Sequence, residues 1–221
     1  MRLSMLAALA AVSFAAASIA VAADAASAPD TAGAPVATVP AAGPLAAVPV
    51  DQAQIVFLDP SNAIANAFAP AVYDVTPGES RAFLAKLGAH VNAAAFVAPG
   101  HHLLMVRTLA VTQFLDTTVE AGHRYYVLVR FVYGHGFQLR PLRPSVSSGT
   151  SEYSTGNPKF KEWLSDAAWP AHTDEYPQGS DPAKFAARLD EHQAAGLAEW
   201  NAKTPDQKAE LTLTVADAVD H

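Results

Sequence analysis

The residues of this chain whose types and spacing could do chemistry are histidines. His101 and His102 follow Pro99-Gly100 and open the apolar run HLLMVRTLAV, and His123 follows a second turn at Ala121-Gly122. Imidazole nitrogens bind zinc and transfer protons near neutral pH. A metal site needs three or four groups that converge on one ion, so the path of the chain decides whether these histidines can form one.

Strand direction limits which histidines can meet. If the segments between the turns are strands that run up and down, each turn carries the chain to the opposite end of the sheet. His101, His102 and His123 then lie at one end, and His90 and His135 lie at the other. Neighbouring residues of a strand point to opposite faces, so only one of His101 and His102 can join His123.

We interpret Pro99-Gly100 as the turn of a hairpin between VNAAAFV and HLLMVRTLAV, with Gly100 supplying the backbone freedom. On this interpretation His101 and His102 are turn and strand-edge residues, and the sequence predicts no catalytic residue, no metal and no cofactor. The alternative is a metal-binding protein or a hydrolase that uses a histidine rim, with His101 or His102 beside His123.

Other catalytic signals are few. The sequence has no Gly-x-Ser-x-Gly elbow, no His-Glu-x-x-His helix and no Gly-x-x-x-x-Gly-Lys phosphate loop. Asp174 and Glu175 would serve glycoside chemistry only if they faced each other across a cleft. We interpret these two residues as neighbouring surface acids.

A pair of tyrosines in RYYVLVRFV (124–132) is the remaining candidate. Tyr125 continues an apolar face with Val127 and Val129, which predicts that its ring lies in the core. The pair could contribute to a binding surface, and Tyr126 is the member on the other, mixed face. The candidate binding residues are therefore His101, His102, His123 and Tyr126.

Charge and cysteine content exclude several classes of function. The 221 residues include 14 Lys and Arg against 21 Asp and Glu, which gives a net charge of -7. A nucleic-acid surface would show clustered Lys and Arg, so we expect no nucleic-acid partner. The chain has no cysteine, which excludes disulfides, a thiol nucleophile, cysteine-bound zinc and a lipidated cysteine.

The N-terminus has the three parts of a secretory signal. Arg2 supplies the charge, residues 5–17 form a short apolar stretch, and Ala20-Val21-Ala22 matches the small-x-small pattern of signal peptidase sites. We expect a signal peptide over 1–22 and a periplasmic or secreted protein. Residues 23–50 are rich in Ala and Pro and predict a disordered linker. No later segment has the roughly 20 apolar residues needed to span a bilayer.

Residues 51–144 have the pattern of a β-domain. About eight short runs rich in Val, Phe, Tyr and Leu, such as AQIVFLD (53–59), are separated by Gly and Pro turns. Their length and spacing predict antiparallel strands in a small β-sandwich or barrel. The chain is therefore expected to be mainly β with some α.

Residues 145–221 are expected to form a helical extension. Asn157-Pro158, Asp181-Pro182 and the capping-box spacing of Thr204 and Gln207 mark three helix starts, and 211–219 fits either helix or strand. Trp163, Trp169 and Trp200 need an apolar cover, so we expect the extension to pack on the β-domain. Docking of a partner protein on these tryptophans is a further alternative.

The β-region resembles a bacterial family of secreted and lipoprotein domains of unknown function. The resemblance covers about residues 52–143 and rests on AQIVFLDPS (53–61), APGHHLLMV (98–106), EAGHRYYVLV (120–129) and FQLRPL (137–142). The region is more loosely similar to PEGA-type surface β-sandwich domains. The resemblance implies an envelope-associated β-sandwich without established enzymatic activity. Many relatives carry a lipidated cysteine near the start, which this chain lacks.

We therefore expect an exported, non-catalytic binding or scaffolding module of the bacterial envelope. Its expected partners are other envelope proteins or cell-wall components.

Overall fold

The computed structural model describes residues 45–61, 69–108, 111–144, 151–170, 175 and 180–219. The expected signal peptide, the linker before residue 45 and Asp174 lie outside the described residues. At the end of the expected linker, the Ala46 carbonyl accepts a hydrogen bond of 2.5 Å from Nη2 of the buried Arg124.

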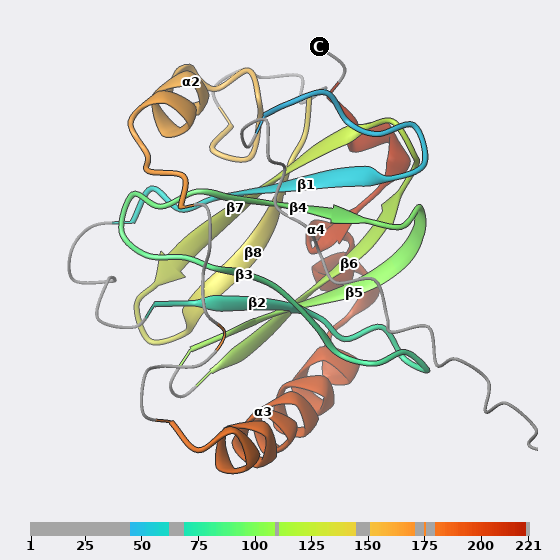
Figure 1. The fold of residues 1–221 in the computed structure, drawn as a ribbon, viewed down its shortest axis with the longest axis vertical. Coiled ribbons are helices and arrows are strands. Elements are labelled where there is room, and N and C mark those ends of the chain that lie inside the picture. Colours follow the sequence, from blue (N-terminus) through green and yellow to red (C-terminus); the bar gives the residue numbers. More distant parts are fainter. Residues whose placement is uncertain are drawn as a thin grey trace, which may run out of the picture. The chain divides into compact units, whose positions relative to one another are not determined.

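The fold is a β-sandwich with a helical C-terminal extension, as the sequence predicted (Figure 1). Two sheets of the described residues face each other, with strand orders β4-β1-β7-β8 and β3-β2-β5-β6-β9. The strands are β1 (Ala53–Leu58), β2 (Ala71–Asp74), β3 (Ala82–Lys86), β4 (Ala93–Val97), β5 (Gly100–Arg107), β6 (Thr112–Val119), β7 (Arg124–Val132), β8 (Gly136–Leu142) and β9 (Thr212–Leu213).

The core between the sheets follows from the two-residue period of the strands. On β7, Tyr125, Val127 and Val129 are fully buried and share one hydrophobic cluster with Ile55 and Phe57 of β1. The opposite faces of the same strands carry Tyr126 and Leu128 in a second cluster with Phe160. Tyr125 therefore lies in the core, as predicted.

Strand pairing differs from the sequence expectation in one place within residues 51–144. β1 pairs with β7 in parallel, with Gln54 opposite Arg124, so the expectation of antiparallel strands is wrong for this pair. β6 also pairs in parallel, with β9 of the C-terminal extension. Successive strands do reverse direction, but β1 and β7 are separated by an even number of reversals and therefore run the same way when they become neighbours.

The Pro99-Gly100 segment is not a hairpin within one sheet, and this expectation is wrong. β4 pairs with β1 in one sheet, and β5 pairs with β2 and β6 in the other, so Ala98-Pro99 carries the chain between the sheets. Gly100 has φ +133°, in the region that L residues rarely adopt. The glycine therefore permits a crossover between layers rather than a two-residue turn.

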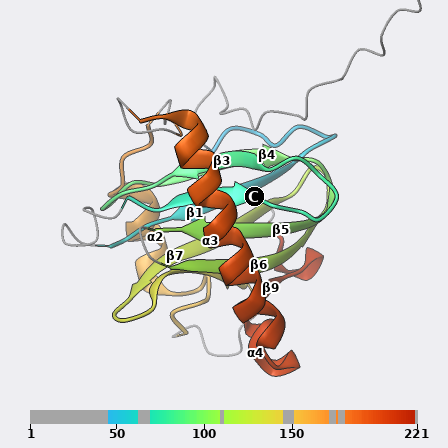
Figure 2. The same cartoon turned by 90° about the horizontal axis from the view of Figure 1, so that it is seen from below.

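Two helices cover the outer faces of the sandwich. Figure 1 shows α2 (Pro158–Ser165) and α3 (Pro182–Ala202) on opposite sides, and Figure 2 shows α3 crossing β5 and β6. Phe160 of α2 packs edge-on against Tyr126 with ring centroids 4.9 Å apart. On α3, Gly196 lies so close to β6 that an added Cβ would be 2.9 Å from atoms of Phe114 and Thr112.

The three predicted helix starts are confirmed. Asn157 and Asp181 cap α2 and α3, and Thr204 forms a capping box with Gln207 at α4 (Pro205–Glu210). The ambiguous end of the chain contains both kinds of structure, because β9 is followed by a 3-10 turn at Val215–Asp217. The extension therefore packs on the β-domain and also completes one of its sheets.

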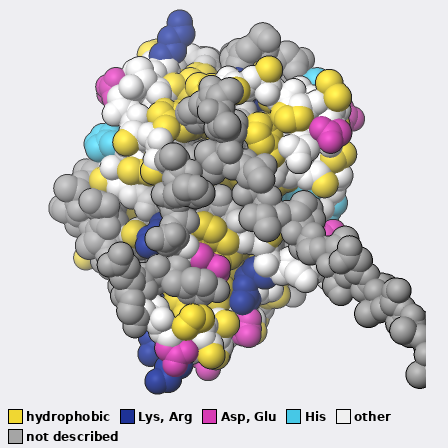
Figure 3. Space-filling view, in the orientation of Figure 1, with side chains coloured by type: hydrophobic (Ala, Val, Ile, Leu, Met, Phe, Trp, Pro, Cys, Tyr) yellow, Lys and Arg dark blue, Asp and Glu magenta, His cyan; other side chains and the backbone are white. Residues whose placement is uncertain are grey.

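Trp200 is buried, whereas Trp163 and Trp169 are partly buried against the cluster around Tyr126. Within the described ranges, no helix combines the length and the apolar character that a membrane crossing requires. On the face shown in Figure 3, charged side chains of both signs are scattered over the described residues.

Candidate functional site

His101 and His102 point to opposite faces of β5, as predicted. The His101 side chain is 55% exposed, and its Nε2 lies 2.8 Å from Oδ1 of Asp116 on β6. The His102 side chain is 8% exposed and faces the other sheet side, where it meets Asp74 at the end of β2. Alternation along a strand thus separates the two imidazoles, and they share no ligand or partner.

Both ring nitrogens of His102 are used by the protein. Nδ1 lies 2.6 Å from Oδ2 of Asp74, and Nε2 lies 2.8 Å from the carbonyl oxygen of Ala98. Thr76 donates to the other Asp74 oxygen from both its amide and its hydroxyl. His102 therefore fastens β5 to β2 and to the crossover from β4, and no ring nitrogen is left for a metal.

The pKa values of the His102–Asp74 pair fit this structural role. Burial alone would lower the pKa of His102, but the hydrogen bonds to Asp74 and Ala98 and the Asp74 charge raise it above 6.5. Burial alone would raise the pKa of Asp74, but the hydrogen bonds from His102 and Thr76 bring it below 3.8. The pair is therefore an imidazolium bound to a carboxylate over the range between these values.

His123 lies at the same end of the sandwich as His101 and His102, as predicted from the turns. Ala53 of β1 is opposite Val97, Gln54 is opposite Arg124, and the Gln54 amide donates to the His123 carbonyl. Among the described residues, however, no three His, Cys, Asp or Glu side chains are grouped so that they could hold a metal ion. Shared position at this rim does not bring the predicted histidines into one site.

Tyr126 is 1% exposed on the outer face of its sheet, where α2 covers it. Burial raises the pKa of the Tyr126 hydroxyl. Phe160 of α2 occupies the face of the sheet on which the Tyr126 ring lies. The pair Asp174 and Glu175 cannot be placed, since Asp174 is outside the described residues.

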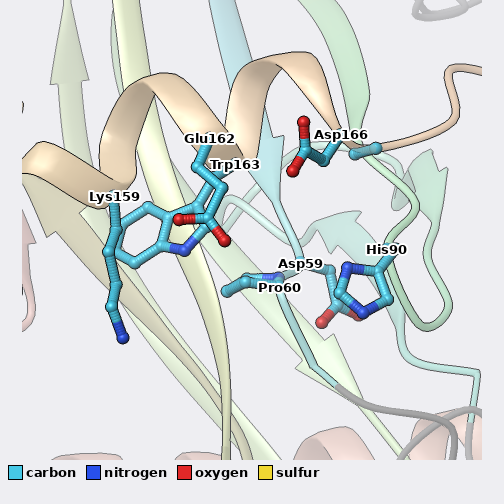
Figure 4. Close-up of a pocket in the computed structure, with 8 residues that line it drawn as sticks. Asp59, Pro60, His90, Lys159, Glu162, Trp163 and Asp166 are labelled. Atoms are coloured by element: carbon cyan, nitrogen blue, oxygen red, sulfur yellow. The ribbon is translucent and has the colours of Figure 1, made fainter.

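A cavity with polar side chains lies at the opposite end of the sandwich. It has a volume of about 190 Å³ and is lined by Asp59, Pro60, His90, Lys159, Glu162, Trp163, Asp166 and Ala167, which we call the Asp59 pocket. Figure 4 shows the Asp59 carboxyl beside the His90 ring, and the Glu162 and Asp166 side chains extending from the region of α2. The pocket thus lies between the end of β1, the turn before β4, and α2 with the residues that follow it.

Asp59 forms the buried part of the pocket. It follows the last residue of β1 and is 0% exposed, and Oδ1 accepts a hydrogen bond of 3.0 Å from the Ser61 amide. Oδ2 has no hydrogen-bond partner among the described residues. Burial raises the Asp59 pKa to about 6, although Ser61 and the charge of His90 favour the ionised form. Such a carboxyl changes its charge close to neutral pH.

Asn92 holds the parts of the pocket together. Its Oδ1 accepts from the Asp59 amide at 3.2 Å, and its Nδ2 donates to the Trp163 carbonyl at 2.7 Å. The Ala168 amide donates to the His90 carbonyl at 2.8 Å, which ties the segment after α2 to the turn. These bonds satisfy buried backbone groups and at the same time fix the walls of the pocket.

His90 has a backbone conformation that favours glycine, with φ +54°. The Val91 amide donates to the Gly88 carbonyl across this turn, and the His90 side chain is exposed at the pocket wall. A histidine in the left-handed region costs conformational energy that a glycine would avoid. The chain has a histidine at this position although a glycine would avoid the conformational energy.

Sequence reasoning missed this site. Asp59 and His90 are 31 residues apart in the numbering, and α2 begins 68 residues after His90. The available local signal was an Asp directly after an apolar strand and before Pro60-Ser61. An acid in that position is typical of a strand end and a turn, so it did not stand out.

Beside the pocket, the Ser61 hydroxyl is buried and has no hydrogen-bond partner among the described residues. Glu162 and Asp166 are four residues apart, and both side chains are exposed. The arrangement offers a buried carboxyl, two exposed carboxylates and an indole to a small polar molecule. Comparison of the chain with protein-family models and with curated proteins gave no match to either.

Proposed function

We propose that this chain is an exported, non-catalytic binding module of the bacterial envelope that holds a small ligand in the Asp59 pocket. The observation that carries the proposal is the Asp59 carboxyl, which lies fully buried at a cavity with one oxygen unpartnered among the described residues. A buried polar atom without a partner is destabilising by about 1–3 kcal/mol. A ligand that supplies the missing hydrogen bond offsets this cost when it binds.

The two ends of the sandwich treat a buried aspartate in opposite ways, which supports the proposal. Asp74 has a histidine, a threonine hydroxyl and an amide as partners, and its pKa is lowered. Asp59 accepts from one amide on Oδ1 and has no partner on Oδ2 in the part of the chain that the structure describes, and its pKa is raised to about 6. The partners of Asp74 are typical of a structural ion pair, whereas the open oxygen of Asp59 can accept a hydrogen bond from a ligand.

The size of the cavity favours a small molecule over a protein segment. Its volume of about 190 Å³ is below the roughly 300–1,000 Å³ of pockets that hold drug-sized ligands. A molecule no larger than a single amino acid or monosaccharide fits such a space. A protein or polymer partner would place only one residue or unit in it.

Export is supported by the N-terminal sequence. The charged Arg2, the apolar stretch over 5–17 and Ala20-Val21-Ala22 have the order of a secretory signal, and the next residues have the composition of a spacer. We propose that the binding module acts in the periplasm or outside the cell, where cell-wall components and other envelope proteins are its candidate partners.

The test is an NMR screen of the isotopically labelled protein against a library of small amines, carboxylic acids, alcohols and sugars. We expect the shifts of bound fragments to cluster at Asp59, His90 and the Trp163 indole. These shifts should disappear in Trp163→Leu and persist in Trp169→Leu, since Trp169 belongs to the same apolar cluster but does not line the pocket.

Two results would count against the proposal. One is a screen in which no fragment shifts the pocket resonances of the folded protein. The other is stoichiometric zinc in the purified native protein that is lost in His123→Ala, which would restore the histidine rim as the functional site.

A further inference from the structure

We propose that the ligand of the Asp59 pocket carries an organic ammonium group, with Asp59 as its counter-ion and Trp163 as its aromatic wall. This inference rests on the proposed binding function and names the chemical class of the ligand. It follows from three features of the pocket: the balance of charge, the unpartnered oxygen at the buried end and the position of the indole.

The charge of the pocket favours a cation. Its lining includes three carboxyl groups, on Asp59, Glu162 and Asp166, against a single lysine, Lys159. In Figure 4 the Lys159 ammonium lies far from Asp59 and His90, at the other side of the row of labelled residues. Among the described residues, none of the salt bridges involves Lys159, Glu162 or Asp59.

The Asp59 oxygen needs a donor, and a donor with a positive charge suits it best. Oδ2 is buried and has no hydrogen-bond partner among residues 45–61, 69–108 and the other described ranges, and the residue is 0% exposed. A hydrogen bond between an ionised donor and a carboxylate is about twice as strong as one between neutral groups. An ammonium therefore satisfies the oxygen and offsets the cost of burying its charge, whereas an alcohol provides only the hydrogen bond.

Trp163 adds an interaction that distinguishes a cation from a neutral donor. Its indole is partly buried and lines the same cavity, and its carbonyl is held by Asn92, which fixes the backbone of this residue. The face of an indole attracts organic cations more strongly than the other aromatic rings do. A carboxylate next to an aromatic wall is the combination that recognises alkylammonium groups.

The charged groups around Asp59 set the expected pH dependence. His90 lies beside it in the turn before β4, and Ser61 follows it on its own segment. Glu162, Asp166 and Lys159 line the same cavity from the region of α2, with the Lys159 ammonium at the far side. Burial raises the Asp59 pKa to about 6. The binding of a cation should therefore strengthen as the pH rises through about 6, where Asp59 ionises, and level off above it.

The experiment compares n-butylammonium, n-butanol and n-butyrate, which share a shape and differ in charge. Each is titrated into the labelled full chain at about pH 8, where Asp59 is ionised. We expect n-butylammonium to shift the Asp59 and Trp163 resonances with a dissociation constant on the order of 1–10 mM, as suits so small a ligand. Asp59→Asn should weaken this binding about tenfold or more, and the matched variant Asp206→Asn on α4 should leave it unchanged.

The outcomes separate the ligand class from the proposed function. Binding of n-butanol as tightly as n-butylammonium, or tighter binding of n-butyrate, overturns the ammonium while leaving a binding pocket. If none of the three binds but other fragments of the NMR screen shift the pocket, the ammonium is again wrong and the binding function stands. If no fragment of either set shifts the pocket, both fail.

Discussion

Replacing Asp59 by asparagine should stabilise the protein above about pH 7, although the residue is fully buried. Burial raises the Asp59 pKa from 3.8 to about 6. Because the folded state binds this proton more tightly than the unfolded state, the contribution of Asp59 to stability is complete below 3.8 and is lost as the pH rises through about 6.

The size of the effect follows from the same pKa values. A rise from 3.8 to about 6 corresponds to about 3 kcal/mol lost from the free energy of unfolding once Asp59 is ionised. Asparagine has no charge and keeps an oxygen that can accept from the Ser61 amide. Its amide nitrogen takes the place of Oδ2, which accepts no hydrogen bond from the described residues, so none of these bonds is lost. We therefore expect Asp59→Asn to be more stable than the native protein by about 2–3 kcal/mol above the Asp59 pKa.

The assay is urea unfolding of both proteins at about pH 4 and about pH 8, with Asp206→Asn as a control for the loss of an exposed carboxylate. The stability difference between Asp59→Asn and the native protein should be small at the lower pH and large at the higher one. A difference that does not change with pH, or a destabilised variant above the Asp59 pKa, would refute the assignment of Asp59 as a buried carboxyl without a partner.

Three further predictions concern the scaffold. Asp74→Asn should destabilise the protein by about 2–4 kcal/mol because it breaks a buried ion pair. His102→Gln should cost a similar amount of stability, and the loss should be largest between the pKa of folded Asp74 and that of folded His102. It should decline as the pH rises above 6.5 through the pKa of folded His102, which is higher still. Gly196→Ala should destabilise by about 1–2 kcal/mol despite the better helix propensity of alanine, because its Cβ would lie 2.9 Å from β6. His90→Gly should be about 1 kcal/mol more stable than His90→Ala, because only glycine adopts φ +54° without strain.

Chemical unfolding measures all three, and each has an outcome that contradicts it. If Asp74→Asn had the same free energy of unfolding as the native protein, the ion pair with His102 would contribute nothing to stability. Ala194→Gly on the exposed face of α3 calibrates the helix propensity, so a stabilising Gly196→Ala would show that α3 is free to move away from β6. Equal stability of the two His90 variants would mean that the turn does not hold the positive φ.

The features that the sequence predicted correctly are local. Capping residues such as Asn157 and Thr204 act within one turn of their own helix, and the alternation that buries Tyr125 needs only the two-residue period of a strand. The same period correctly placed His101 and His102 on opposite faces. Their grouping with His123 at one end followed from counting reversals of the chain.

The features that it missed depend on contacts between distant segments. The sequence around Pro99 does not indicate that β4 and β5 belong to different sheets, because the strands that pair with each of them lie elsewhere in the chain. His102 is buried by Asp74, which is 28 residues away. Asp59 lies at a cavity to which α2 and the His90 turn contribute walls, and both are distant from it in the sequence.

Titration of Asp59 itself tests most directly whether this buried carboxyl binds a cationic ligand. Carbon-detected NMR of the Asp59 side chain across the acid and neutral pH range gives its pKa in the native protein, first alone and then with saturating n-butylammonium. We predict a midpoint near 6 for the free protein and a clear move to lower pH with the ammonium bound. A midpoint at or below about 4 that does not respond to n-butylammonium would contradict the account.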